Sequence, residues 1–393
     1  MADPHITSNK KILILSVSAG AGHGRAAEAL RAQAAFDFPE LEVKHVDVMQ
    51  FASAAFRKVY TDFYLHLVNK APSVWAYLYN YSNEAKADSR LERMRRAIEA
   101  WNAKKLLKFI HEFSPDAIIC THFLPAELLS RMRARAETTP PVWVQVTDFD
   151  LHRMWVHEHI QGYFAANEEV AFRMREQGIA EQTIHVTGIP IMPAFTLAPE
   201  REICAKELNC DPQKLTLMLM SGGAGVGKMA ALAERILGMP LTRAEADFQL
   251  IVLTGKNQTA LQQLQMMQPS YQGRLFPIGF SNQVERLMAC SDLIVTKPGG
   301  LTTSECLAMG LPMIVNAPIP GQEERNADYV MESGAALKAV DEAALLYRIQ
   351  YLIQHPEKVQ RMREHAKAIA RPHAAHDVLQ QVMAHVMSLQ NPV

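Results

Sequence analysis

Short, almost continuously apolar runs alternate with longer segments of helical periodicity along most of the chain. The first run, residues 11–17, is apolar at nearly every position and ends at a glycine-rich turn. Such runs are typical of strands that are buried on both faces of a parallel sheet. Four further runs predict strands at 42–48, 117–120, 142–147 and 162–165. Strands that alternate with helices predict βαβ units.

The same pattern begins again after a proline-dense stretch at residues 189–199. The strands expected in this second series are 215–220, 249–254, 275–278, 293–296 and 313–316. We therefore predict an α/β protein of two Rossmann-like, doubly wound domains in series. The expected domains are 1–193 and 194–365, followed by a C-terminal helix within 366–393 that packs back on the first domain.

Length, charge and cysteine usage narrow the class of protein. A chain of 393 residues suits two domains better than one. Its 40 Lys and Arg residues balance 41 Asp and Glu residues, so bulk charge gives no reason to expect nucleic acid as a partner. Five cysteines without a C-x-x-C pair are typical of reduced thiols in a cytoplasmic protein. No run reaches the roughly 18 apolar residues of a spanning helix, so we expect any membrane association to be peripheral.

The first glycine-rich turn, residues 18–27, lies between a strand and a helix that we expect to begin near Arg25. Gly20 and Gly22 would let the backbone approach a ligand. His23 follows these glycines, before the expected helix. It would act either as a general base at an acceptor hydroxyl or as a residue that only forms local hydrogen bonds. A dinucleotide site is disfavoured, although Asp47 closes the second strand, because the spacing is G-x-G-x-G rather than G-x-G-x-x-G.

The second glycine-rich turn, residues 221–229, resembles a phosphate-binding loop with one substitution. The Walker pattern needs Ser or Thr after the lysine to hold magnesium, and this chain has Met229 there. An NTPase is therefore disfavoured. The glycines either open space for a diphosphate or make a tight turn against the following helix.

The third such turn, within residues 292–305, offers the strongest chemical signal. The exposed N–H groups at the expected helix start suit an anionic leaving group, with Thr302 or Thr303 as the cap. Glu305 would lie in about the first turn, either accepting ribose hydroxyls or serving as an ordinary first-turn acid. Residues 318–328 place amides and carboxylates at another turn, which suits sugar hydroxyls but is also a common way to begin a helix.

These segments resemble a known family. KPGGLTTSECLAMGLPMIV followed by PGQEERNADYV is similar to the donor-binding signature of glycosyltransferase family 28. SAGAGHGRAAEAL, VTDFDLHRMWVHEHIQGYFAANEE and VTGIPIMPAF resemble the branch of monogalactosyldiacylglycerol synthases and processive diacylglycerol glucosyltransferases. The matches occur in order from about residue 12 to residue 329 and cover both expected domains.

The resemblance implies a GT-B fold, in which the two doubly wound domains face a central cleft. It also implies an inverting transfer of a hexose from UDP-glucose or UDP-galactose to diacylglycerol, without a metal or other cofactor. It also implies donor contacts in the second domain. These would be Gly223 and Gly225 at the diphosphate, Phe280 at the uracil, Gly299, Gly300, Leu301 and Thr302 at the phosphate-binding helix start, Glu305 at the ribose, and Gln322 and Glu323 at the sugar hydroxyls.

The first domain would then hold the acceptor and the base. We expect His23 to remove the acceptor proton, with Asp148 as the competing base or as the residue that orients His23. His152 and Trp155 would shape the acceptor side together with Gly20 and Gly22, or they would simply pack at the end of a strand.

Residues 51–81 are rich in aromatic side chains with basic residues among them. Phe56, Tyr60 and Phe63 would either dock on an anionic membrane surface at the inner face of the cell membrane or belong to core helices. Three rival functions stay open: transfer to another acceptor, epimerisation of a UDP-sugar, and UDP-sugar binding without catalysis. A lipid-free assay would separate the epimerase from the transferase.

Overall fold

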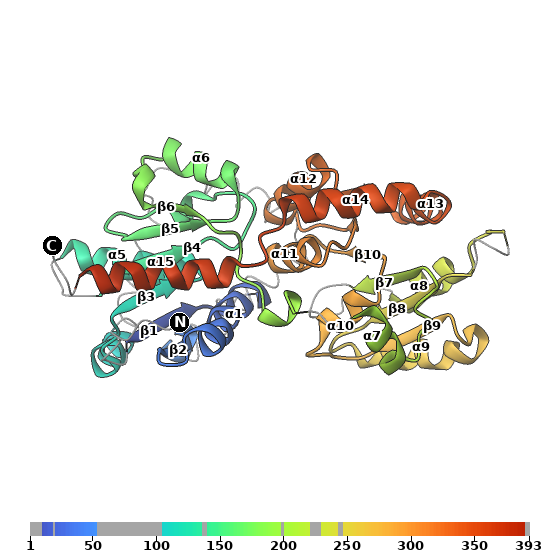
Figure 1. The fold of residues 1–393 in the computed structure, drawn as a ribbon, viewed down its shortest axis with the longest axis horizontal. Helices are drawn as coiled ribbons and strands as arrows, with labels where there is room; N and C mark the ends of the chain where they lie inside the picture. Colours follow the sequence, from blue (N-terminus) through green and yellow to red (C-terminus); the bar gives the residue numbers. More distant parts are fainter. Residues whose placement is uncertain are drawn as a thin grey trace. The chain divides into compact units, whose positions relative to one another are not determined.

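The computed structural model describes residues 10–18, 20–52, 104–135, 140–197, 200–220, 229–242 and 247–389. The chain divides into two compact units, one of Met1–Pro193 with His373–Val393 and the other of Ala194–Pro372. Each unit has its own parallel sheet covered by helices (Figure 1). The structure is therefore the predicted α/β fold with two Rossmann-like units.

The sheet of the first unit has six parallel strands in the order β2-β1-β3-β4-β5-β6. Their bounds are β1 (Lys11–Ser16), β2 (Glu42–Asp47), β3 (Ala117–Cys120), β4 (Val142–Gln145), β5 (Gly162–Ala165) and β6 (Ile184–Val186). The strand order reverses direction at β1, which pairs with β2 on one side and β3 on the other. In open α/β sheets such a switch point, at the carboxyl ends of the strands, is where ligands bind.

Helices cover both sheets. Among the described residues, those of the first unit are α1 (Ala21–Asp37), α5 (Phe123–Ala134), α6 (Glu168–Glu176) and α15 (Ala374–Ser388), with the short 3-10 helices η1 (Val48–Gln50), η2 (Arg153–Trp155), η3 (Glu181–Thr183) and, at the boundary, η4 (Pro193–Phe195). α15, the red helix beside α1 in Figure 1, buries its apolar face on α1 and the sheet. His376 Nδ1 and Asp37 Oδ2, 2.6 Å apart, join the two helices. Residues 366–372 belong to the second unit, so the chain returns to the first unit at His373 rather than at 366.

The sheet of the second unit also has six parallel strands, in the order β12-β11-β10-β7-β8-β9. Their bounds are β7 (Thr216–Met220), β8 (Gln249–Leu253), β9 (Leu275–Ile278), β10 (Leu293–Thr296), β11 (Met313–Asn316) and β12 (Ala336–Ala339). The helices of this unit are α7 (Arg201–Leu208), α8 (Met229–Leu237), α9 (Gln258–Met267), α10 (Val284–Ala289), α11 (Gly300–Ala308), α12 (Gln322–Glu332), α13 (Glu342–Gln354) and α14 (Pro356–Ile369), with η5 (Gln268–Tyr271).

The two strands that the sequence did not predict, β6 and β12, are the edge strands of their sheets on one side. Each is short and only partly buried. An edge strand has a neighbour on one side only and keeps polar residues such as His185 and Lys338, so it lacks the continuous apolar run of a central strand. The opposite edge strands, β2 and β9, were predicted, so the sequence pattern failed only at these two short edges.

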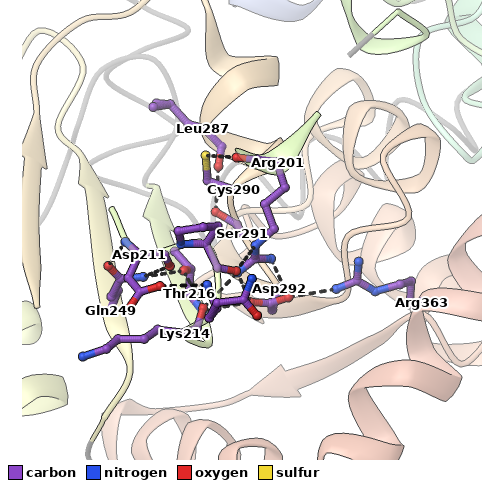
Figure 2. A network of polar contacts seen from close by, with 12 residues as sticks. Arg201, Asp211, Lys214, Thr216, Gln249, Leu287, Cys290, Ser291, Asp292 and Arg363 are labelled. Atoms are coloured by element: carbon purple, nitrogen blue, oxygen red, sulfur yellow. Dashed lines mark hydrogen bonds and ion pairs between the residues drawn. The ribbon is translucent and has the colours of Figure 1, made fainter. Parts of the chain in front are cut away.

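At the amino ends of β7 and β10, the carboxylate of Asp292 connects β10 with α7, β7 and α14 of the second unit (Figure 2). Asp292 accepts two hydrogen bonds from the guanidinium of Arg201, at 2.8 and 2.9 Å, and one from Thr216 N at 2.9 Å. Arg363 of α14 donates a further one at 3.3 Å. The network lies at the end of the strands opposite to the expected site, so its role is structural.

Candidate active site

The helix that follows β1 begins earlier than the sequence suggested. Gly20 is the N-cap of α1, with φ of 96° and ψ of 148°, and the helix starts at Ala21 rather than near Arg25. That backbone conformation is unfavourable for residues with a Cβ, so the glycine lets the chain turn from strand to helix within a few residues. His23 therefore lies in the first turn of α1 and not in the loop before it.

The turn before α1 is held by Asp47 at the end of β2. Its Oδ1 accepts hydrogen bonds from Ser18 N at 3.2 Å and from Met49 N at 3.0 Å. A dinucleotide site would use an acid at this position for a ribose. In this chain the carboxylate instead binds backbone N–H groups and fixes the turn.

His23 is oriented by the ends of two neighbouring strands. Its Nδ1 lies 3.0 Å from the carbonyl oxygen of Thr121 and 2.9 Å from Thr147 Oγ1. The hydroxyl of Thr121 donates in turn to the carbonyl oxygen of His23, at 2.9 Å. Because a carbonyl only accepts, Nδ1 carries the proton, and Nε2 of the neutral ring keeps a lone pair. Thr121 and Thr147, which the sequence did not single out, thus hold the ring of His23.

The surroundings of His23 keep its ring neutral near pH 7. Part of the side chain stays accessible, yet the protein packs around it closely enough that burial lowers its pKa to about 4. The hydrogen bond to Thr121 opposes this shift without cancelling it. Asp148 is buried and directly follows Thr147, and its role as an alternative base stays a prediction.

Three further rings lie beside His23. The ring of His122 is edge-on to it with centroids 4.5 Å apart, and Trp155 lies 6.0 Å away. Phe123 completes the cluster, 4.0 Å from His122 and 5.9 Å from Trp155. His152 caps η2, accepting a hydrogen bond from Met154 N at 3.1 Å. The structure thus brings Trp155 to His23 and adds His122 and Phe123, which the sequence did not single out.

In the second unit, the chain after β10 forms the expected helix start with a different cap. Gly299 is the N-cap of α11, no side chain caps the helix, and Thr302 and Thr303 lie within it, so the expected threonine cap is wrong. The N–H groups of Gly300 and Leu301 come before the first intrahelical bond and are available to an anion. Glu305 lies beyond the first turn and is 2% exposed, not in the first turn as expected.

The segment before α12 comes close to this helix start. Glu323 Oε2 accepts a hydrogen bond from Ile319 N at 2.7 Å, and a Cβ on Gly299 would lie 4.0 Å from Glu323 Oε1. Burial raises the pKa of Glu323, while the Ile319 N–H and the charge of Lys297 act in the opposite direction. Gln322 is the first residue of α12. Residues from two separate motifs therefore meet at the carboxyl end of β10.

Phe280 follows β9 and is 60% exposed. Lys256 Nζ lies 6.0 Å from the centroid of its ring. An exposed ring of this kind can stack on a nucleobase, as the sequence predicted for the uracil.

Several predicted positions lie outside the described residues: Gly223, Gly225, Phe56, Tyr60 and Phe63. Within the described ranges, no group of three or more His, Cys, Asp or Glu residues is arranged to hold a metal ion. None of the described helices is both long enough and apolar enough to cross a bilayer.

Two Rossmann-like units in series, one with an oriented histidine and the other with an open helix start, define the class of GT-B enzymes. Solved structures of this class share the fold. The chain is similar to a Staphylococcus aureus MnaA–UDP structure, with a TM-score of 0.64, 15% identity and 98% of each chain covered. It is also similar to Acinetobacter baumannii MurG, with a TM-score of 0.55, 12% identity and coverage of 95% of this chain and 99% of that one.

Sequence comparisons define the family. The family model for monogalactosyldiacylglycerol (MGDG) synthase matches residues 23–191, and that for the glycosyltransferase family 28 C-terminal domain matches residues 219–382. A processive diacylglycerol beta-glucosyltransferase of Bacillus pumilus is 28% identical over 380 residues, 96% of each chain. Its Bacillus cereus counterpart is 29% identical over 384 residues, 96% of this chain and 94% of that one. The chain belongs to glycosyltransferase family 28, in the branch of these lipid glycosyltransferases.

Proposed function

We propose that this glycosyltransferase transfers glucose from UDP-glucose to diacylglycerol, with inversion at the anomeric carbon. The names of the relatives support diacylglycerol as acceptor and glucose as the sugar. A solved structure of the same fold that contains UDP supports a UDP-sugar as donor. UDP-galactose is the competing donor, because one of the two matching family models is that of a monogalactosyldiacylglycerol synthase.

The observation that carries this proposal is the hydrogen bonding of His23. With Nδ1 donating to Thr121, the lone pair of Nε2 can take a proton. In the proposed step the acceptor oxygen forms a bond to C1 of glucose while its proton moves to Nε2. The bond between C1 and the diphosphate oxygen breaks, and UDP leaves with that electron pair. A positioned base of this kind contributes on the order of 10² to 10⁴ in rate.

The second unit would stabilise the leaving UDP. The open N–H groups at the start of α11 and the positive charge of Lys297 suit the negative charge that develops on the diphosphate. Glu323, beside Gly299, would accept from sugar hydroxyls. No metal ion takes part in this proposal. Transfer that is abolished by EDTA and restored by Mg²⁺ would contradict that part of it.

The test is to incubate the protein with diacylglycerol liposomes and either UDP-glucose or UDP-galactose, then to determine the mass, sugar and anomeric configuration of the lipid product. We expect a β-glucosyl product, and a His23→Ala variant that is at least 100-fold slower. His111→Ala, which changes an exposed histidine of the same unit, serves as the control. Near-normal turnover by His23→Ala together with loss of turnover by Asp148→Asn would assign the base to Asp148.

We further propose that the protein acts as a peripheral protein at the inner face of the cell membrane. The aromatic and basic residues between 51 and 81 support this. Liposome flotation with anionic lipid tests it. Unchanged flotation after Phe56, Tyr60 and Phe63 are replaced by Ser would refute docking through these side chains.

A further inference from the structure

His122 has no part in the step described above, yet it lies directly beside His23. It follows β3, and its Nδ1 accepts a hydrogen bond from Leu124 N at 3.0 Å as the N-cap of α5. Because Nδ1 accepts, the proton of the neutral ring is on Nε2. Burial, and to a lesser extent the neighbouring His23, hold the pKa of His122 well below its usual range, so the ring is neutral near pH 7.

The two rings are therefore opposite tautomers. His23 has its proton on Nδ1 and a lone pair on Nε2, whereas His122 has a lone pair on Nδ1 and its proton on Nε2. Their centroids are 4.5 Å apart. Hydrogen bonds of about 3 Å allow one oxygen atom to bridge two nitrogens up to about 6 Å apart, and a shared hydroxyl requires the two Nε2 atoms to lie within that reach.

The hydrogen bonding of His122 gives a second reason to look for a ligand. The residue is 2% exposed, and none of the described residues accepts a hydrogen bond from its Nε2. This nitrogen is not among the fully buried unpaired atoms of the described residues, so it keeps some accessible surface. A role limited to capping α5 would need only Nδ1. The unused Nε2–H is therefore available to a bound molecule.

We infer that His122 is a second acceptor-binding residue, and that its Nε2–H donates to the hydroxyl oxygen whose proton His23 Nε2 accepts. The pair selects a group that both accepts and donates, which is the chemistry of an alcohol. Donation from His122 holds the oxygen with its proton directed at His23. This inference rests on the proposed function, since it assigns the acceptor of the same reaction.

Asparagine at position 122 separates this role from capping. Asn is a good N-cap, so His122→Asn keeps an acceptor for Leu124 N but lacks the ring Nε2–H. We expect His122→Asn to keep the wild-type melting temperature and UDP affinity while kcat/KM for diacylglycerol falls about 10- to 100-fold. His122→Ala should lose both stability and activity, and His111→Asn neither. Wild-type kcat/KM in His122→Asn would show that His122 is only a cap and would overturn the inference.

Nuclear magnetic resonance of the ring nitrogens provides a test that does not depend on turnover. The signals should identify His23 as the Nδ1–H tautomer and His122 as the Nε2–H tautomer. Adding 1,2-dioctanoylglycerol should shift the Nε2 signals of both rings, whereas the analogue without the free hydroxyl should not. Shifts without any transfer in the wild type would reject the proposed function and keep the hydroxyl site. Equal shifts with both lipids, or none with either, would reject the site.

Discussion

Replacing Asp292 by Asn should destabilise the second unit by about 3 kcal/mol. Each carboxylate oxygen of Asp292 accepts two hydrogen bonds, and three of the four come from the guanidinium groups of Arg201 and Arg363. Hydrogen bonds to charged groups contribute about 1.5–3 kcal/mol each, and breaking a buried ion pair costs about 3–5 kcal/mol. The side chains of Asp292 and Arg201 keep 22% and 24% exposure, which places the cost at the low end of that range. Asn keeps the shape but loses the charge and turns one acceptor into a donor.

The chain allows the two units to be followed separately. Its four tryptophans are Trp75, Trp101, Trp143 and Trp155. All of them belong to the first unit, so tryptophan fluorescence reports that unit, whereas far-ultraviolet circular dichroism reports the helices of both. For a urea m-value of about 2–3 kcal/mol per M, the midpoint of the second unit should fall by about 1 M, with the fluorescence midpoint unchanged.

Asp247 provides a matched control in the same unit. Its carboxylate is 57% exposed and pairs with Lys214 Nζ at 2.5 Å. An exposed pair of this kind contributes less than about 1 kcal/mol, so Asp247→Asn should have little effect. The reasoning would be refuted if Asp292→Asn shifted the circular dichroism midpoint no more than Asp247→Asn does, or if the fluorescence midpoint fell equally.

Four further predictions concern His23, Phe280 and Thr303. With the pKa of His23 at about 4, kcat/KM for diacylglycerol should stay level from pH 8 to about pH 5, whereas an inflection near pH 6.5 would indicate an ordinary histidine. Neutral His23 also contributes stability that is complete above pH 6.5 and is lost as the pH falls toward 4, measurable as a falling midpoint of the fluorescence transition. Phe280→Ala should raise the KM for UDP-glucose about 5- to 100-fold, while Phe172→Ala, at another exposed ring near a cation, should not. Thr303→Val should leave the stability of the second unit unchanged or raise it, because the buried Thr303 hydroxyl has no partner among the described residues; a loss above about 1 kcal/mol by urea unfolding would contradict this.

The apolar pattern of the sequence predicted the strands in the interior of both sheets, because a strand with neighbours on each side is apolar at almost every position. The starts of the two helices were less predictable. Both begin directly after a glycine, Gly20 or Gly299, and neither helix has a side-chain cap that would mark its start in the sequence. His23 therefore lies in the first turn of α1 instead of the loop before it, and Glu305 lies beyond the first turn of α11 instead of within it.

The hydrogen-bond partners of His23 could not be predicted from the sequence, for a different reason. Thr121 and Thr147 lie 98 and 124 residues from His23 along the chain, so no local motif contains them. A signal did exist, because parallel strands bring their carboxyl ends to one edge of the sheet, and both threonines stand at or just after the end of a predicted strand. The sequence alone did not say which of these residues point toward His23.

The two halves of the site thus differ in how they are encoded. On the proposed donor side, the backbone N–H groups at the start of α11 belong to one contiguous segment, Lys297 with the residues that follow, whereas Phe280 and Glu323 lie outside that segment. The proposed acceptor side relies on the tautomers of two histidines, and each tautomer is fixed by a backbone group: the Thr121 carbonyl for His23 and the Leu124 N–H for His122. A sequence motif shows that a histidine is present but not which nitrogen carries its proton. The chemistry proposed for the acceptor therefore depends on the fold, whereas the helix start proposed for the donor could be recognised from one contiguous motif.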